Sequence, residues 1–519
     1  MSETRIIVIG AGMGGLSAAI ALAAKGCDVT ILDRGTAPGG KARTQDSAAG
    51  PVNAGPTVLT LRVVFDELFE EAGAALDDYV TLAPEPLLAR HFWPDGSRLD
   101  LTSNEGENAR AIANFAGPAA GKEFRAFAAR ARRLFATFED PMLRAPAPRP
   151  LSFAALVARD PGLLRAMSPG RSLAGRLARD FTDPRLRQLF GRYATYVGGS
   201  PFGTPALLSL IWEAEAAGIW RVEGGIAALA RGMAALATDL GARIRYASVA
   251  TRIVTDEGRV SAVELEDGTV LDCDRVVFNG DPRALRHGLL GSDVTDAVPR
   301  GAVEPLSLSA EVWAFAARPQ GADLVHHNVF FGRDPHSEFD RIADGLPPLD
   351  PTIYVCAQDR GTGRTPPDGP ERFEIIVNAA PDTPEQEFNQ CRQRTFTTLA
   401  ERDLRFDPEP PATALTGPRG FGRLFPGSGG ALYGRSPQGT MAAFRRPTAQ
   451  SAVPGLYLAG GGTHPGAGVP MAALSGRHAA SAIGLSLSST GRSDAADMHG
   501  GISTESPTTE PAASRPSGS

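Results

Sequence analysis

The sequence predicts an α/β fold with a doubly wound sheet, and three observations support this prediction. Residues 5–9 are an apolar run that leads into a G-x-G-x-x-G pattern and then an alanine-rich helical pattern. Residues 29–32 are a second apolar run, which ends in Asp33. Far downstream, residues 456–459 open into a glycine-rich segment that is followed by another helical pattern from Ala472. A strand, a glycine turn and a helix in this order are typical of a Rossmann-type nucleotide-binding domain.

The glycines of the first turn have separate tasks. Gly10 permits the sharp turn after the strand, and Gly12 lacks a Cβ atom, so a pyrophosphate can approach the backbone. Gly15 lets the helix pack closely against the strand. The phosphates would lie at the helix N-terminus, where free N–H groups and the helix dipole favour an anion.

Asp33 lies at the spacing from Gly10 at which a carboxylate accepts a hydrogen bond from the adenosine ribose. A carboxylate here repels a 2′-phosphate, so the pattern favours an unphosphorylated ribose. Arg34 follows directly and keeps an NADP alternative open.

Two further glycine-rich segments favour FAD over a nicotinamide dinucleotide. Gly39 and Gly40 come soon after the second strand, and residues 460–462 form the C-terminal turn. The longer FAD molecule needs this additional close backbone. We therefore predict non-covalent FAD. Its expected binding residues are Gly10, Gly12, Met13, Gly14, Gly15, Asp33, Arg34, Gly39, Gly40, Lys41, Arg43, Gly55, Pro56, Thr57, Gly461, Gly462, Gly468, Val469, Pro470 and Met471.

Composition excludes several classes of protein. The net charge of −6 gives no reason to expect nucleic acid as a partner. The four cysteines show no C-x-x-C spacing, so neither a metal site nor a disulfide framework is predicted. The first strand begins too early for a signal peptide to precede it, and no apolar run is long enough to span a bilayer. We expect a cytoplasmic protein.

A chain of 519 residues is long for one core, so we expect two domains. The predicted FAD-binding domain is discontinuous and comprises residues 1–90, 222–299 and 426–485. Its middle segment has a helical pattern through Leu240 and strand patterns at 244–250, 260–265 and 275–279, which indicate a β insert. Residues 91–221 and 300–425 would form a mixed α+β substrate domain. Residues 486–519 are rich in Ser, Thr, Pro and Gly and are predicted to be disordered.

The motifs together resemble the bacterial phytoene desaturase family of FAD-dependent carotenoid desaturases. The resemblance rests on the N-terminal turn, on Asp33 with the 39–40 glycine pair, and on the segments NAGPTVLT (53–60) and GTHPGAGVPM (462–471). Within the family, YATYVGGSP (193–201) and LAGGGTHP (458–465) are most similar to the hydroxyneurosporene (1-hydroxycarotenoid 3,4-) desaturases of purple phototrophic bacteria. The resemblance extends to about residue 485. Many amine oxidases carry an acidic residue where this chain has Gly461 and Gly462, which disfavours that activity.

The resemblance implies a dehydrogenation in carotenoid biosynthesis. The flavin would take a hydride from an acyclic, 1-hydroxylated carotenoid while the adjacent carbon loses a proton, and oxygen or a quinone would then accept the electrons. Three alternatives stay open: a phytoene desaturase, another flavin amine oxidase, and a non-catalytic prenyl-binding protein similar to the GDP-dissociation inhibitors.

Residues 143–192 contain ten arginines and only three aspartates, with apolar pairs between them. Such a stretch is either a solvated helical face or a surface that binds anionic lipid. Because the implied carotenoid is stored in membrane, we expect peripheral association with the inner (intracytoplasmic) membrane.

No catalytic acid or base is identified from the sequence. His464 lies in the C-terminal glycine turn and is either a base or, as we favour, structural. The side chains that either line a polyene tunnel or pack in the core are Tyr193, Tyr196, Trp212, Trp220, Phe330 and Phe331. His326, His327 and Asn328 are candidate partners for a hydroxylated end group.

Overall fold

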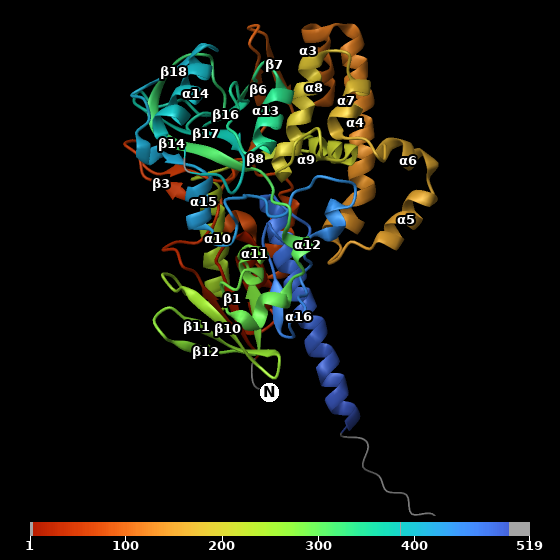
Figure 1. The fold of residues 1–519 in the computed structure, drawn as a ribbon, viewed down its shortest axis with the longest axis vertical. Helices are drawn as coiled ribbons and strands as arrows, with labels where there is room; N and C mark the ends of the chain where they lie inside the picture. Colours follow the sequence, from red (N-terminus) through yellow and green to blue (C-terminus); the bar gives the residue numbers. More distant parts are fainter. Residues whose placement is uncertain (1–3, 385, 498–519) are drawn as a thin grey trace, which may run out of the picture.

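The computed structural model describes residues 4–384 and 386–497, with side chains described up to residue 487. Its lower half in Figure 1 contains a five-stranded parallel sheet in the order β20-β13-β1-β2-β9. These strands are β1 (Arg5–Ile9), β2 (Asp28–Leu32), β9 (Arg243–Arg245), β13 (Arg275–Phe278) and β20 (Leu456–Leu458). Segments from both ends and the middle of the chain therefore build one sheet. The α/β prediction is confirmed.

Both faces of this sheet are covered, which explains why its strands read as apolar runs. Ile6 and Val8 of β1 pack against a helical layer, while Ile7 points to the other face. The helices are α1 (Met13–Ala23), α2 (Val63–Glu71), α10 (Ile226–Asp239) and α16 (Val469–Asp497). The other face is covered by the antiparallel insert of β10 (Ala250–Asp256), β11 (Arg259–Leu265) and β12 (Val270–Asp272).

Helices α1 and α16 follow the N-terminal and C-terminal glycine turns and pack directly against each other. Ser17 Oγ donates a hydrogen bond of 2.7 Å to the Ala473 carbonyl. A Cβ atom at Gly476 would lie only 2.0 Å from the Gly14 carbonyl oxygen. This close approach brings the N-termini of both helices to one place.

Two sequence predictions are wrong in detail. Residues 244–250 are not one strand: β9 ends at Arg245, the backbone turns at Ala247 with φ 49, and β10 begins at Ala250 in the other sheet. The tail is predicted to be disordered from residue 486, yet α16 continues to Asp497, and Leu487 still packs against the helical core. Residues 498–519 of the tail lie outside the described residues.

A second, eight-stranded sheet forms the upper part of the molecule (Figure 1). Its order is β18-β14-β17-β16-β15-β6-β7, with β19 paired to β14. The strands are β6 (Leu87–Phe92), β7 (Arg98–Thr102), β14 (Ser309–Gly321), β15 (His327–Phe330), β16 (Ile353–Ala357), β17 (Glu371–Ala379), β18 (Leu404–Asp407) and β19 (Leu415–Thr416). Because β6 begins at Leu87, this sheet starts slightly before the predicted boundary at residue 90. The division into domains otherwise stays a prediction.

Beside this sheet, a helical layer packs around an aromatic core that includes Phe124, Phe190 and Trp212. The helices are α3 (Glu105–Ala116), α4 (Pro118–Phe138), α5 (Pro150–Ala158), α6 (Pro161–Met167), α7 (Leu173–Asp180), α8 (Pro184–Gly191) and α9 (Ile211–Ala216). Helices α5 and α6 project from the side of the molecule (Figure 1). In the part of the chain that is described, no helix is long and apolar enough to cross a bilayer.

The remaining strands and α-helices lie outside the two sheets, the insert and the helical layers named above. They are β3 (Thr44–Gln45), β4 (Val52–Asn53), β5 (Leu82–Glu85), β8 (Ile219–Val222), α11 (Pro282–Arg286), α12 (Arg300–Val303), α13 (Pro335–Ala343), α14 (Phe388–Ala400) and α15 (Pro418–Leu424).

Candidate active site

A cavity of about 1750 Å³ runs from the glycine turns into the space between the two sheets and the helical layer. Ligand pockets usually measure about 300–1,000 Å³, so this one has room for a cofactor and a second long molecule. Of the predicted binding residues, the following line it: Gly10, Gly12, Met13, Gly14, Asp33, Arg34, Gly39, Gly40, Lys41, Arg43, Gly55, Pro56, Thr57, Gly461, Gly462, Gly468, Val469, Pro470 and Met471. The one that does not is Gly15.

Close packing explains the position of Gly15. A Cβ atom there would lie 2.0 Å from the Gly10 carbonyl oxygen, so the residue lets α1 approach β1. A Cβ atom at Gly14 would lie 2.6 Å from the Gly460 amide nitrogen, which shows how closely the two turns meet. Gly12 differs from both, since its Cβ atom would meet nothing nearer than Asn279 Nδ2 at 3.0 Å.

Asn279 connects the two glycine turns and was missed in the sequence analysis. It directly follows β13, and its Nδ2 donates a hydrogen bond of 3.0 Å to the Gly10 carbonyl. A Cβ atom at Gly460 would lie 2.8 Å from its Oδ1, so the side chain also touches the C-terminal turn. A polar residue at the carboxyl end of a buried strand was the available signal, because ligands bind at that edge of an open α/β sheet.

The Asp33 carboxylate is held in place by two backbone groups. Its Oδ2 accepts a hydrogen bond of 2.6 Å from Ala11 N, and its Oδ1 accepts one of 2.7 Å from Gly35 N. A carboxylate has about four lone-pair sites, so each oxygen keeps room for another donor. Asp33 therefore keeps free acceptor positions at the cavity wall.

Arg446, also missed from the sequence, fixes the C-terminal turn. Its guanidinium donates to the carbonyls of Gly461 (3.0 Å), Tyr433 (2.9 Å) and Arg435 (2.8 Å). Burial lowers the pKa of Arg446 to about 10, and the nearby Asp281 carboxylate opposes this shift. The chain thus ties the turn to the neighbouring loop with a buried charge.

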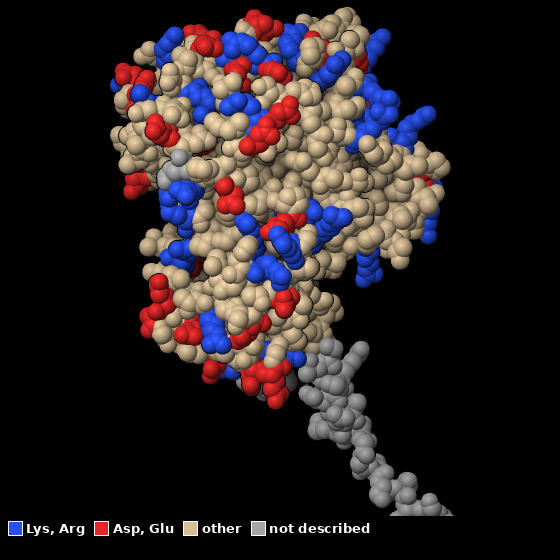
Figure 2. Space-filling model, viewed as in Figure 1, with Lys and Arg blue, Asp and Glu red and all other residues tan. Residues whose placement is uncertain are grey.

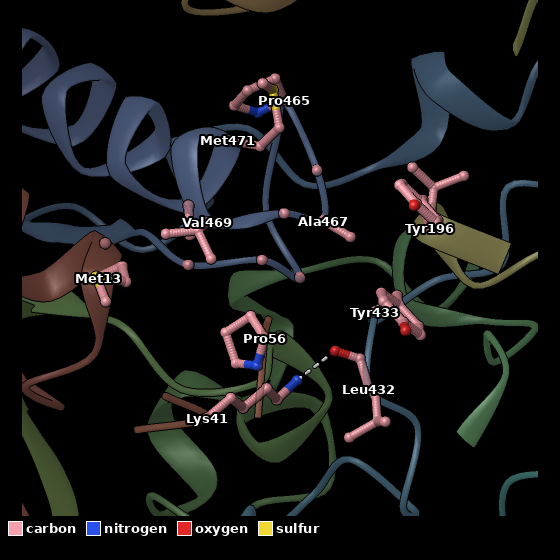
Figure 3. Close-up of a pocket in the computed structure, with 18 of the residues that line it drawn as sticks. Met13, Lys41, Pro56, Tyr196, Leu432, Tyr433, Pro465, Ala467, Val469 and Met471 are labelled. Carbon is pink, nitrogen blue, oxygen red and sulfur yellow. Dashed lines mark hydrogen bonds between the residues drawn. The ribbon is translucent and has the colours of Figure 1, made fainter. Parts of the chain in front are cut away.

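Lys41 and Asp281 extend this charged cluster. Burial lowers the pKa of Lys41, whose Nζ donates a hydrogen bond of 2.6 Å to the Leu432 carbonyl (Figure 3). Burial likewise raises the pKa of Asp281, while the charges of Lys41 and Arg446 lower it. Both residues line the cavity, so they place ionisable groups at its wall.

An open space separates the 41–57 region from the C-terminal turn. A Cβ atom at Gly55 would lie 2.0 Å from the Lys41 carbonyl oxygen, so these two segments are in close contact. Pro56 and Lys41 lie on one side of the space, and Ala467 and Val469 lie on the other (Figure 3). The walls of this space come from all three predicted glycine-rich regions.

His464 lines the cavity, but its ring is held by contacts with residues outside the glycine turn. Its Nε2 lies 2.9 Å from the Ala145 carbonyl, to which it donates, and its ring stacks on that of His478. Burial lowers the pKa of His464 to about 4. These contacts favour the structural interpretation.

Of the six aromatic residues considered for the tunnel, only Tyr196 lines the cavity. Tyr193, Trp212 and Phe331 belong to the aromatic core of the helical layer, and Phe330 packs within the large sheet. Trp220 packs against the core around α1.

The three candidate partners for a hydroxylated end group, residues 326–328, lie behind the cavity wall. His327 Nδ1 lies 2.6 Å from the Tyr354 hydroxyl, and this hydroxyl contacts Thr57 Oγ1 at 2.9 Å. Tyr354 and Thr57 line the cavity, but His326, His327 and Asn328 do not. His326 and His327 group with Cys356, with ligand atoms within 4.8 Å of one another.

The far arm of the cavity has apolar walls. It extends beneath α5 and along the segment before α9, and its lining includes Phe135, Phe138, Met142, Phe153, Met167, Leu207, Leu208, Leu210 and Ile211. Such walls suit a hydrocarbon ligand.

Comparisons with known proteins agree with this geometry. A family model described as flavin containing amine oxidoreductase matches residues 13–484. The chain is 54% identical over 490 residues to a hydroxyneurosporene desaturase of Cereibacter sphaeroides, which covers 94% of this chain and 99% of that protein. It is 32% identical over 491 residues to a lycopene-forming phytoene desaturase of Pseudescherichia vulneris, covering 92% and 98%. A solved oxidoreductase structure from Methanosarcina mazei covers 91% of this chain and 99% of its own, with a TM-score of 0.59 at 16% identity, and shows the fold.

Proposed function

The chain belongs to the flavin containing amine oxidoreductase family, and from this premise we propose that it is a carotenoid 3,4-desaturase acting on an acyclic 1-hydroxycarotenoid. The observation that carries the proposal is the shape of the cavity. The glycine turns and Asp33 line one part of it, apolar side chains line another, and the volume of about 1750 Å³ leaves room for a polyene beside a cofactor. The higher identity to a hydroxyneurosporene desaturase than to a phytoene desaturase supports the hydroxylated substrate.

The residues around the glycine turns fit FAD held without a covalent bond. Gly12 leaves space for the pyrophosphate at the start of α1, and Asp33 would accept hydrogen bonds from the ribose. The space between Pro56 and Val469 would hold the flavin ring (Figure 3). When bound, the flavin supplies the acceptor for the hydride.

The chain itself contributes positioning and a dry environment. The apolar arm would hold the polyene in one orientation, which brings the carbon to be oxidised beside the ring-binding space. With the polyene seated, the apolar walls would reduce the access of water to the reacting carbon. The electron acceptor that we propose for the reduced protein is oxygen or a quinone.

We further propose that α5 and α6 lie against the inner membrane and admit the substrate. Leu151 is 87% exposed and Leu164 is 47% exposed, while Phe153 of the same region lines the cavity. Basic side chains surround this projecting, mostly uncharged surface (Figure 2). Among the described residues, Arg149, Arg159, Arg165 and Arg171 form no ion pair, so they are available to anionic headgroups.

The test is incubation of the FAD-loaded protein with 1-hydroxyneurosporene, neurosporene and phytoene, followed by absorption spectra. A red shift with the hydroxylated carotenoid is expected, because each new conjugated double bond moves absorption to longer wavelength. Desaturation of phytoene, without desaturation of the hydroxylated carotenoid, would favour a phytoene desaturase. Anaerobic bleaching of the flavin by a polyamine would indicate an amine oxidase, and a protein that takes up no FAD would indicate a prenyl-binding carrier.

A further inference from the structure

Two tyrosine hydroxyls on the cavity wall have no role in the function described so far. Tyr196 and Tyr433 lie on the same side of the pocket, across it from Met13 (Figure 3). A Cβ atom at Gly198 would lie 2.5 Å from Cδ2 of Tyr433, so the Tyr433 ring packs against the segment that carries Tyr196. We propose that these two tyrosines together bind the end-group hydroxyl of the carotenoid and select a hydroxylated substrate, an inference that rests on the proposed function.

Tyr196 is oriented by two buried charged groups. Its hydroxyl donates a hydrogen bond of 2.5 Å to Glu215 Oε2 and accepts one of 2.9 Å from Arg192 Nη1. The side chains of Glu215 and Arg192 are only 4% and 8% exposed. A hydroxyl has one donor and two acceptor positions, so Tyr196 has one acceptor position left. It can accept a hydrogen bond from a ligand but has no proton to donate.

Tyr433 supplies the complementary donor. Among the described residues, its hydroxyl has no hydrogen-bond partner, and burial raises its pKa to about 12, so it keeps its proton. Its backbone is fixed by the hydrogen bond from its amide to Ser307 Oγ (3.1 Å) and by the one from Arg446 to its carbonyl (2.9 Å). Tyr433 would donate to the substrate oxygen while Tyr196 accepts the substrate proton. An alcohol would then be satisfied in both roles, and a hydrocarbon end group in neither.

The position of this pair fits the bond to be oxidised. Arg446 bonds both to the Tyr433 carbonyl and to Gly461 of the C-terminal turn, so the pair lies beside the flavin-binding end of the cavity. In a 1-hydroxycarotenoid only two C–C bonds of about 1.5 Å each separate the hydroxylated carbon from C3. The partner of the hydroxyl must therefore lie next to the reacting carbons. It follows that the hydroxylated end enters first and that the polyene extends along the apolar arm.

The test compares wild type with Tyr196→Phe and Tyr433→Phe, using 1-hydroxyneurosporene and neurosporene. We expect each substitution to reduce the ratio of kcat/KM for the hydroxylated over the unhydroxylated substrate about tenfold, the effect of one lost hydrogen bond in a buried site. The loss should come mainly from a higher KM for the hydroxylated substrate. Tyr193→Phe is the matched control: its hydroxyl donates to the same Glu215 at 2.7 Å but does not line the cavity. This variant should keep the wild-type ratio.

A second measurement needs no variant. A short tertiary alcohol with one isoprenoid unit on its chain should inhibit the wild type at about tenfold lower concentration than the hydrocarbon of the same carbon skeleton. Equal inhibition, or an unchanged substrate ratio in both tyrosine variants, would overturn the inference. If the wild type desaturates both carotenoids equally, the desaturase proposal stands and the inference fails. If FAD-loaded wild type desaturates neither, the proposed function itself is wrong.

Discussion

Replacement of Gly12 by valine tests the cofactor site without disturbing the fold. The backbone φ of Gly12 is −78°, which any residue adopts, and its Cβ atom would meet only Asn279 Nδ2 at 3.0 Å and Gly39 O at 3.9 Å. The change should lower the free energy of unfolding by only about 1 kcal/mol, the usual cost of a poor residue at a helix N-cap. The two added methyl groups would enter the space in which the pyrophosphate is proposed to bind.

The effect on FAD should be much larger than the effect on stability. Displacing a phosphate from one or two charge-assisted hydrogen bonds costs about 3 kcal/mol, which raises the Kd about 100-fold. The assay is the ratio of flavin to protein absorbance after gel filtration, together with fluorescence titration of the stripped protein with FAD.

Gly15→Ala is the matched comparison, because its Cβ atom would lie 2.0 Å from the Gly10 carbonyl oxygen. This backbone clash should lower the free energy of unfolding by about 3 kcal/mol or more, measured by urea denaturation. Wild-type FAD affinity in Gly12→Val would refute the assignment of this turn to the pyrophosphate.

Further predictions concern the C-terminal turn, pH and the membrane. Arg446→Met should lower the free energy of unfolding by about 3 kcal/mol, because three buried or partly buried carbonyls lose their donor; an unchanged urea midpoint would contradict this. Burial raises the pKa of Glu338 from 4.5 to about 7 in the folded protein. Its contribution to stability is therefore complete below pH 4.5, the pKa in the unfolded chain, and is lost as the pH rises through the folded-state pKa of about 7. Glu338→Gln should flatten this decline in urea-unfolding series between about pH 4 and 8, and parallel curves for both proteins would argue against it. Glu substitutions at Leu151 and Leu164 should reduce co-flotation with anionic liposomes, whereas Leu349→Glu, at a site 69% exposed but outside α5 and α6, should not.

The sequence predicted those parts of the site that are formed by residues adjacent along the chain. The apolar runs indicated the strands of the parallel sheet, and the glycines marked the turns that follow them. Gly10 has φ 104°, a backbone conformation that favours glycine and is needed for the sharp turn after β1. These signals are readable because a strand, its turn and the next helix are adjacent along the chain.

Other features were not readable from any local pattern. Asn279 bonds to Gly10, which lies more than two hundred residues earlier in the chain, and Arg446 bonds to Gly461 from a separate loop. The residues next to Asn279 and Arg446 in the sequence give no sign of these contacts. The 244–250 run looked like one strand, but its halves belong to different sheets. The sequence around Tyr193 and Tyr196 does not distinguish their roles. Only the packing of the helical layer places Tyr196 at the cavity and Tyr193 in the core.

The sequence alone was sufficient for the fold class, the glycine turns and the carboxylate after the second strand, since each depends on backbone geometry and apolar periodicity over a few residues. Only the tertiary structure shows that the glycine turns from the two ends of the chain meet at Asn279. It also decides which aromatic residues line the cavity and which pack in the core. The physical reason is that contacts between distant segments depend on how complete layers pack, and the residues adjacent to each contact in the chain do not encode that packing.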